Sequence, residues 1–443
     1  MKFKTKDLIK IAIPIILEYM LSIMVNLFDT IMVSSSGEAA VSAVSLVGSI
    51  SAFLTVFFIS LCVGGAVVIS QLVGKKNFET ARESAKQLVY LSFIVSSVVC
   101  AIIVLFDGPI LQLIFGKVEP EIMNNAKKYF FIIGLCYPVI GIQAACASIL
   151  RAQGKTKLTL WISVGGNLVN ICGNAILIYG FGLGVVGAAV SSLISYIVST
   201  IIAFRFVLRK GEETVYIDKF FKYKPNMWHI RKICHIGIPS SLEDSFFNLG
   251  RLLVASLVSG FGTASIAANA VAQTLTGFHF QAGSAIGAAC MTVVGMCVGA
   301  RDHAEAKKSV KKFMLFVVIT FAILSVFFIA TSGFFAKVFN LSDEATKICN
   351  KIILINGIAT VIIWTFAFTL SAAFRAASDV RFTMVVSIFS MFTFRVGGSY
   401  LLANAFGLGV YSVWIAMICD WVFRASVFVP RFIKGKWLTK YTD

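Results

Sequence analysis

Residues 11–35 read IAIPIILEYMLSIMVNLFDTIMVSS, a stretch that is long and apolar enough to cross a membrane as one helix. It carries two carboxylates, Glu18 and Asp29, and no basic residue. An unpaired carboxylate in hydrocarbon costs at least ~2.5 kcal/mol, so it normally faces a bundle interior, a water-filled cavity or a partner. The two carboxylates lie eleven positions apart, close to three helical turns, and so project from nearly the same face. The stretch therefore predicts a membrane helix with one acidic, functional face.

The rest of the chain has the composition of a polytopic membrane protein. Of its 443 residues, 58% are hydrophobic and 14% are charged, and its mean hydropathy is +0.88, which is outside the range of soluble proteins. Its ten cysteines show no CxxC pair and no metal-ligand spacing, so we expect no firm metal site and no cofactor. Twelve apolar segments of membrane-spanning length occur near 9–33, 47–72, 88–106, 129–150, 158–180, 184–208, 234–259, 271–298, 313–331, 352–373, 382–402 and 408–430.

The net charge of +18 follows the connections between these segments. When alternate connections are assigned to opposite sides, one side holds 30 lysines and arginines and the other holds six, while three arginines remain inside the segments. Cytoplasmic loops carry the basic excess in membrane proteins, so both termini are predicted to be cytoplasmic. This distribution accounts for the charge through topology and contact with membrane lipids, and we expect no nucleic-acid partner.

An internal repeat divides the chain into two halves. One constant shift, which places Ile13 on Ile238, preserves several short motifs in order, and this is the signature of a duplicated unit. The matched pairs are IPIILE (13–18) with IPSSLE (238–243), QLVGKKNFETAR (71–82) with MCVGARDHAEAK (296–307), FGLGV (181–185) with FGLGV (406–410) and, with one residue of slack, LRAQGKTK (150–157) with FRAASDVR (374–381).

The predicted fold is therefore an all-α polytopic membrane protein with twelve transmembrane helices in two six-helix lobes. Six spans return the chain to its starting side, so the lobes should be related by a pseudo-twofold axis along the membrane normal. Glycines inside the spans, Gly64 and Gly165 among them, are expected to allow close helix packing. The expected parts are a first lobe at 1–208, a polar cytoplasmic linker at 209–233, a second lobe at 234–430 and a basic cytoplasmic tail at 431–443.

Several segments together resemble the multidrug and toxic compound extrusion (MATE) family. They are the repeated IPxxLE opening, NLFDTIMVSSSGEAAVSA, the RAQGKTK loop, NICGNAILIYGFGLGVVGAA and GFGTASIAANAVA. The resemblance implies a secondary-active antiporter in a bacterial cytoplasmic membrane, not an enzyme. It would be a monomer that exports drug-like, often cationic amphipathic molecules in exchange for H⁺ in preference to Na⁺.

The same resemblance implies an ion-coupling site in the first lobe. Asp29 matches the family's acid on the first helix, Asn170 its asparagine on the fifth and Ser192 its hydroxyl on the sixth. Asn174 stands where many members carry an aspartate, which removes one of two charges. Na⁺ favours oxygen ligands including carboxylates, so this departure weakens, without excluding, a sodium site at Asp29, Asn170, Asn174 and Ser192.

The two halves differ in how their buried charges are balanced. In the first half no basic residue within the spans can neutralise Glu18 or Asp29. Burial should therefore favour the neutral forms of both carboxylates, which makes both candidates for carrying a proton. In the second half three acids face three arginines, which predicts a compensated, structural or gating cluster. Its members are Glu243, Asp244, Arg251, Arg395, Asp420 and Arg424. Three polar side chains are further candidates for the substrate cleft: His279, Gln281 and Asn26.

Other classes of transporter fit the sequence less well. A lipid-linked oligosaccharide or lipid flippase of the same superfamily is the main alternative, but such proteins often have fourteen spans and a strongly basic cavity. Major facilitator carriers usually have a Gly-x-x-x-Asp-Arg-x-Gly-Arg-Arg type loop after the second helix, where this chain reads QLVGKKNFETAR. An ATP-driven pump would need a GxxxxGK[ST] phosphate loop, and the sequence contains none.

Overall fold

The computed structural model describes residues 2–116, 118–218, 220 and 224–440, and within them the chain is almost entirely helical, with no strand. Lys117, parts of the expected linker (219 and 221–223) and the end of the expected tail (441–443) lie outside the described residues. The elements of the first half are α1 (Thr5–Ser34), α2 (Glu38–Gly74), α3 (Phe78–Phe115), α4 (Pro120–Ala152), α5 (Thr156–Asn174), η1 (Ala175–Gly180) and α6 (Gly184–Leu208).

The second half repeats this order with more interruptions. Its fourth and fifth long helices, residues 343–376 and 380–406, each contain a π-helical segment, and a short 3₁₀ turn follows its first helix. The elements are α7 (Met227–Val258), η2 (Ser259–Phe261), α8 (Thr263–Gly299), α9 (His303–Val338), α10 (Asp343–Ala359), η3 (Thr360–Thr369), α11 (Leu370–Ala376), α12 (Val380–Ser390), η4 (Met391–Gly397), α13 (Gly398–Phe406), α14 (Tyr411–Lys434) and η5 (Lys436–Lys440).

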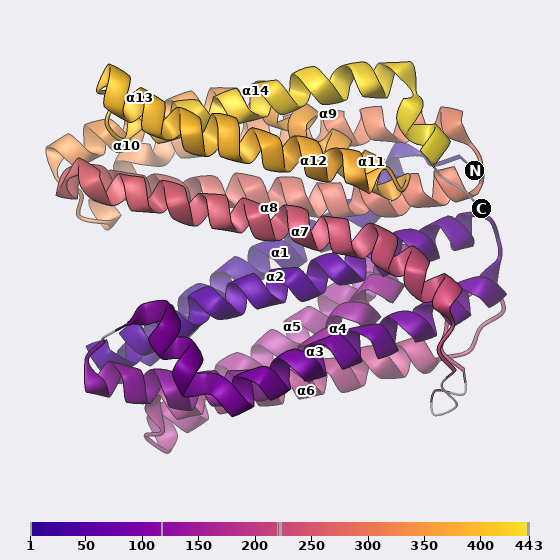
Figure 1. Cartoon of the computed structure of the whole chain (residues 1–443), viewed down its shortest axis with the longest axis horizontal. Helices are drawn as coiled ribbons and strands as arrows, with labels where there is room; N and C mark the ends of the chain where they lie inside the picture. Colours follow the sequence, from indigo (N-terminus) through magenta and orange to yellow (C-terminus); the bar gives the residue numbers. More distant parts are fainter. Residues whose placement is uncertain (1, 117, 219, 221–223, 441–443) are drawn as a thin grey trace. The chain divides into compact units, whose positions relative to one another are not determined.

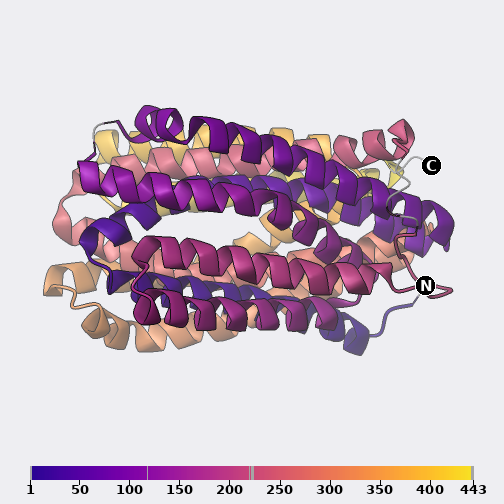
Figure 2. The same cartoon turned by 90° about the horizontal axis from the view of Figure 1, so that it is seen from below.

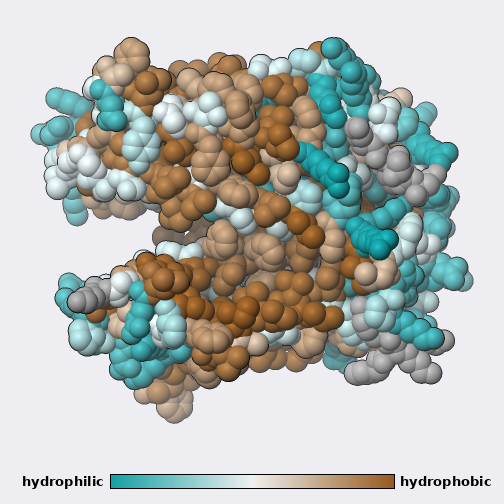
Figure 3. All heavy atoms as spheres, in the orientation of Figure 1, coloured by the Kyte–Doolittle hydropathy of each residue, from teal (hydrophilic) through white to brown (hydrophobic). Residues whose placement is uncertain are grey.

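The expectation of twelve membrane-length helices is confirmed. Eleven of the long helices are apolar enough to cross a membrane by length and composition, and α7, with 32 residues and several charged side chains, is the twelfth. Within each compact unit the helices run side by side in two perpendicular views (Figures 1 and 2). Hydrophobic side chains cover the middle of the helices and hydrophilic ones gather toward their ends (Figure 3). This is the pattern of an integral membrane protein.

The chain forms two compact units, Leu17–Ser241 and a second made of Met1–Ile16 with Leu242–Asp443. Their boundaries cut α1 after Ile16 and α7 after Ser241, two positions that the repeat makes equivalent. The lobe expected from hydropathy at 1–208 keeps α1 whole, and the one expected at 234–430 leaves the first seven residues of α7 to the linker. The compact units instead assign the beginning of α1 and the beginning of α7 each to the unit that does not hold the rest of that helix.

The internal repeat is visible in the backbone itself. Residues with positive φ, which only a few residue types adopt readily, recur at equivalent places in the turns of both halves. The pairs are Gly37 (98°) with Gly262 (87°), Lys76 (59°) with Arg301 (57°), Gly154 (73°) with Ser378 (66°) and Gly182 (65°) with Gly407 (62°). The helix caps repeat as well, because Asn77 accepts a hydrogen bond from Thr80 N and Asp302 accepts one from Glu305 N.

The connection after α6 is held against the first compact unit. Arg82 on α3 donates hydrogen bonds to the carbonyl oxygens of Thr214, Gly211 and Glu212 and stacks on the ring of Tyr216. Gln153 forms two hydrogen bonds with the backbone of a single residue, one to Val215 N and one to its carbonyl oxygen. The polar composition of this segment therefore serves docking onto the loop ends of the bundle, in addition to joining the two halves.

Gly64 on α2 tests the role of close helix packing. A Cβ atom at this position would lie 2.5 Å from both Gly237 N and Ile233 O, two backbone atoms of α7 that have no room to move. We expect Gly64→Ala to destabilise the protein by about 1–3 kcal/mol, the usual cost of overpacking. Gly165→Ala on α5 is the matched control, because nothing lies within 4 Å of its added methyl group.

The measurement is the thermal unfolding midpoint of each purified variant in detergent. Gly165→Ala should unfold at the parental temperature or slightly above it, since alanine favours a helix over glycine. Equal midpoints for the two variants would show that the α2–α7 contact is loose.

Candidate functional site

Asp29, near the end of α1, meets the end of α5. Asn174, the last residue of α5, donates a hydrogen bond from Nδ2 to Asp29 Oδ1 at 2.6 Å. Asn174 is buried and Asp29 is half-buried. The π-helical segment η1 begins directly after Asn174, and such segments are frequent at functional sites because they reorient side chains. The helix therefore changes its winding at the residue that holds the carboxylate.

Asn170 occupies the preceding turn of α5 and faces α6. Its Nδ2 donates to Ser192 Oγ at 3.2 Å, while Ser191 Oγ donates to the carbonyl oxygen of Asn170 at 2.7 Å. The side-chain oxygens Oδ1 of Asn170 and Asn174 are both buried, and neither has a hydrogen-bond partner within the described part of the chain. Two adjacent turns of α5 thus present two unused amide oxygens, and they contact the hydroxyl of Ser192 on α6 and the carboxylate of Asp29 on α1. Groups of these kinds can bind a proton or a hard cation.

Two tyrosines lie within the membrane helices of the same unit. Tyr129 on α4 and Tyr196 on α6 are half-buried, and Tyr129 packs against the apolar cluster that holds Val33 of α1 and Ile178 of η1. No pattern in the sequence marks either residue as functional. The available signal was weak, a phenol within an apolar helix, because most membrane-helix tyrosines only pack. Both hydroxyl groups can exchange hydrogen bonds with a carboxylate in either protonation state.

Glu18 has a basic partner, so the expectation that no base answers it is wrong. Arg151 Nη2 lies 2.6 Å from Glu18 Oε1, and Thr159 Oγ1 donates to Glu18 Oε2 at 3.1 Å. Arg151 stands at the end of α4, where hydropathy assigns it to a loop, but its long side chain reaches back to α1. Among the described residues Asp29 has no such basic partner, so the two carboxylates of α1 lie in different surroundings.

The second half contains an equivalent ion pair. Glu243 Oε1 lies 3.7 Å from Arg375 Nη2 and accepts a hydrogen bond from Ser387 Oγ at 2.7 Å. Asp244 Oδ1 lies 3.9 Å from Arg375 Nη1. Glu243 matches Glu18 under the constant shift of the repeat, and Arg375 matches Arg151 with the one-residue slack. The glutamate of the IPxxLE motif is thus paired in each half with an arginine from the end of the fourth long helix.

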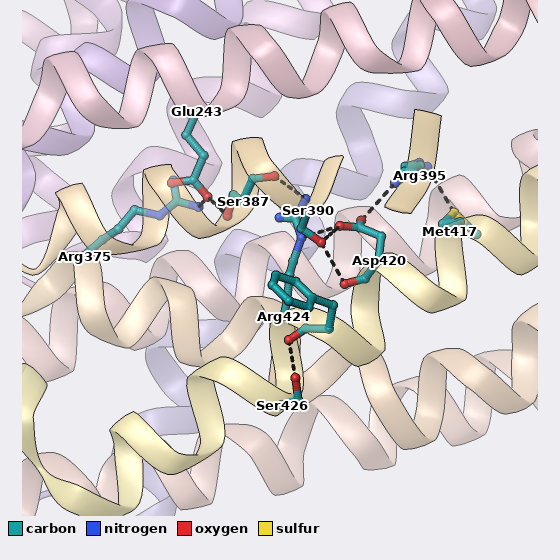
Figure 4. Close-up of polar contacts among 10 residues, drawn as sticks. Glu243, Arg375, Ser387, Ser390, Arg395, Met417, Asp420, Arg424 and Ser426 are labelled. Atoms are coloured by element: carbon teal, nitrogen blue, oxygen red, sulfur yellow. Dashed lines mark hydrogen bonds and ion pairs between the residues drawn. The ribbon is translucent and has the colours of Figure 1, made fainter. Parts of the chain in front are cut away.

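A separate group forms around Asp420 on α14. Arg424 Nε contacts Asp420 Oδ1 at 2.8 Å, Ser390 donates to the same oxygen, and Arg395 Nη1 lies 4.0 Å from Oδ2 (Figure 4). The carbonyl oxygen of Ser387 accepts from Arg424 Nη2 at 3.2 Å, so Ser387 touches both charged groups. Asp420 is 0% exposed, and a carboxylate this deeply buried stays charged only beside cations.

The prediction of one compensated cluster of three acids and three arginines in the second half is therefore wrong. The structure divides the six residues into two groups and adds Arg375, which hydropathy places in a loop. Arg251 is exposed and forms no ion pair with any described residue. Glu243 and Arg251 share a face of α7, but eight residues of helix separate them by about 12 Å along the axis. That distance is too long for a salt bridge.

The three cleft candidates occupy different environments. His279 is 2% exposed and packs against the rings of Phe321 and Phe328. Its Nε2 lies 3.0 Å from Ser325 Oγ, whose proton goes to the carbonyl oxygen of Gly357, so the imidazole donates from Nε2. Gln281 is half-buried and Asn26 is exposed. His279 is thus part of the core between α8, α9 and α10.

Twelve membrane-length helices in the described part of the chain, arranged in two sequence repeats with ionisable side chains held inside both units, define a polytopic membrane protein. The family model MatE matches residues 14–176 and 239–401. The constant shift of the repeat places the first and last residues of one region on those of the other. The chain belongs to the MatE family, whose members are transporters and not enzymes.

Two curated relatives align with nearly the whole chain. An uncharacterized transporter, YisQ of Bacillus subtilis (strain 168), is 26% identical over 99% of this chain and 96% of its own length. A probable multidrug resistance protein, NorM of Thermotoga maritima, is 28% identical over 98% of this chain and 93% of its own length. The fold is similar to a solved structure described as the outward-facing conformation of a multidrug resistance MATE family transporter, with a TM-score of 0.91, 21% identity and coverage of 99% and 97%.

The Glu18–Arg151 pair makes a prediction about stability. Arg151→Met leaves the Glu18 carboxylate buried without a cation, so we expect a loss of about 3–5 kcal/mol in the free energy of unfolding. The double variant Glu18→Gln/Arg151→Met removes both charges and should recover most of that loss. The check is a double-mutant cycle on detergent-purified protein, followed by thermal unfolding. Additive effects of the two substitutions would contradict a direct pair.

Proposed function

We propose that this protein is a secondary-active antiporter that exports organic, often cationic amphipathic molecules in exchange for H⁺, with Asp29 as its coupling residue. The proposal is carried by one observation, the hydrogen bond from Asn174 to a carboxylate that lacks a basic partner in the described part of the chain. A carboxylate in a membrane bundle that no cation neutralises is a binding site for a proton or a positively charged ligand. The multidrug resistance names of relatives such as NorM support small-molecule export.

The chemistry of the site suggests how protons and substrate compete. When Asp29 is deprotonated, it carries the only formal charge of the group and attracts a cation, while Asn174 Nδ2 stabilises the carboxylate. When Asp29 is protonated, that charge is gone and its new hydroxyl group can donate a hydrogen bond to Oδ1 of Asn170 or of Asn174. Neither of these two oxygens has another partner among the described residues. Proton uptake from outside would thus release the cation and rearrange the hydrogen bonds between α1 and α5.

Na⁺ is the alternative coupling ion. The carboxylate of Asp29, the amide oxygens of Asn170 and Asn174 and the hydroxyl of Ser192 are oxygen donors that Na⁺ accepts. Asn174 in place of a second carboxylate lowers the negative charge of the site by one, which favours a proton over a metal ion. Gradients of pH and of Na⁺, applied separately, distinguish the two ions.

The proposed membrane is the bacterial cytoplasmic membrane, with both termini in the cytoplasm and the protein acting as a monomer. The basic connections after α2, α4 and α6, and those after α8 and α11, support this orientation by the positive-inside rule. A lipid-linked oligosaccharide or lipid flippase remains the alternative function, and it would transport its cargo without a requirement for Asp29.

Asp29→Asn keeps the size of the side chain and removes its titration. We expect this variant to reach the membrane in the parental amount and to lose proton-driven export of ethidium from proteoliposomes at least tenfold. Asp107→Asn on α3 is the matched control, since its carboxylate bonds only to the neighbouring Gly108 N within the described structure, and it should transport normally. Glu18→Gln should keep part of the activity. Export by Asp29→Asn at the parental rate would place coupling elsewhere.

The orientation is tested with reporter fusions. Green fluorescent protein joined to the C terminus should fluoresce, because it folds in the cytoplasm. Alkaline phosphatase joined after Phe339, in the connection between α9 and α10, should be active, because it needs the oxidising outer side. The opposite pattern would reverse the predicted topology.

A further inference from the structure

The group around Asp420 carries more positive than negative charge. Arg395 and Arg424 share the single carboxylate of Asp420. Arg251 lies one helical turn after Phe247, whose ring is 5.2 Å from the guanidinium group of Arg395 and 5.6 Å from that of Arg424. Gly250, the residue before Arg251, packs against Met391, which lies one turn before Arg395. Three guanidinium groups therefore face one carboxylate, whereas the neighbouring group holds two carboxylates, Glu243 and Asp244, for one arginine. The buried acids and arginines of the second half nearly balance when they are all counted together. Neither of the two groups is neutral by itself.

One oxygen of the Asp420 carboxylate is occupied by other partners, while Oδ2 is buried and accepts no hydrogen bond within the described residues. Its Oδ1 receives both Arg424 Nε and the hydroxyl of Ser390, so Arg424 is its main cation. Arg395 approaches Oδ2 only to 4.0 Å, and its Nη2 contacts the weak acceptor Met417 Sδ. Arg395 Nε is buried and has no acceptor among the described residues. Arg395 and the exposed Arg251 are thus left with unused donors.

A second buried donor without a partner lies on the same helix as Asp420. Trp421, next to Asp420 on α14, is 1% exposed, and its Nε1 has no hydrogen-bond partner within the described residues. Aromatic rings surround the guanidinium groups: Phe247 lies 5.2 Å from Arg395 and 5.6 Å from Arg424, and Phe368 lies 5.2 Å from Arg424. The local surroundings combine unpaired donors, excess positive charge and flat apolar surfaces.

Repelling arginines inside a membrane bundle are unfavourable unless an anion joins them. We propose that Arg251 and Arg395 bind the anionic group of an amphipathic ligand, a phosphate or a carboxylate attached to an aromatic or aliphatic body. Guanidinium groups match these anions because their planar donors pair with two oxygens at once. Arg251 supplies the accessible contact, Arg395 the deeper one, and the phenylalanines receive the apolar part. The second unit would thus accept negatively charged or zwitterionic molecules.

This inference deepens the proposed export function by naming a ligand class, and it rests on that function for its meaning in the cell. Binding itself needs no gradient. Asp29→Asn is therefore expected to bind the anion as the parent does, while failing to couple transport to protons. A failure of the coupling proposal and a failure of the anion site give different results.

The test uses three probes with the full-length protein in detergent: phenyl phosphate, phenyltrimethylammonium and inorganic phosphate. Isothermal titration calorimetry should show that phenyl phosphate binds at least tenfold more tightly than either other probe. Arg251→Gln should weaken phenyl phosphate binding at least tenfold, and Arg251→Lys, which keeps the charge and loses the planar fork, should weaken it less. Arg381→Gln, an exposed arginine at the start of α12 in the same unit, is the control and should bind normally.

Nanodiscs distinguish the two sources of the anion. If a lipid headgroup is the natural occupant, phosphatidylglycerol should weaken phenyl phosphate binding relative to phosphatidylcholine alone, and Arg251→Gln should remove the difference. If a soluble anion is the ligand, both lipid compositions should give the same affinity. Equal binding by the parent and Arg251→Gln, a preference for phenyltrimethylammonium, or no binding of phenyl phosphate would overturn the proposal.

Discussion

The arrangement of the helices depends on how charges are matched inside bundles that face lipid. Hydrocarbon offers no hydrogen bonds, so each ionisable side chain must obtain a partner from the protein. Glu18 obtains Arg151 and Thr159, and Glu243 obtains Arg375 and Ser387. Each pair ties the first helix of a repeat to the end of its fourth. The duplication therefore preserved an interaction that fixes helix positions as well as a sequence motif.

Both proposed sites lie where this matching is incomplete. Asp29 has an amide partner and no cation in the described structure, and Arg395 approaches Asp420 only to 4.0 Å while Arg251 forms no ion pair with any described residue. The two proposals thus place a negative site in one half and a positive one in the other. A transporter with both could handle cations and anions by different routes. The two halves share their backbone and have diverged in their charge.

The sequence was sufficient for the helices, the repeat and the resemblance that grouped Asp29 with Asn174. These depend on local periodicity and on residue order, which a single chain displays. Arg151 and Arg375 could not be identified, because hydropathy places them in loops and their side chains reach back into the bundle. The balance of three acids and three arginines was counted correctly by segment, yet pairing depends on height along the helices and on rotation about them. Those quantities separated Arg251 from Glu243.

The division of α1 after Ile16 and of α7 after Ser241 has a mechanical consequence. Each helix starts in one unit and finishes in the other, so the chain joins the two units only through the middle of these two helices. Pro14 and Pro239 lie two residues before the divisions, and each removes a backbone hydrogen bond from its helix. Both covalent connections between the units therefore carry the same local weakness, a missing backbone hydrogen bond just before the division.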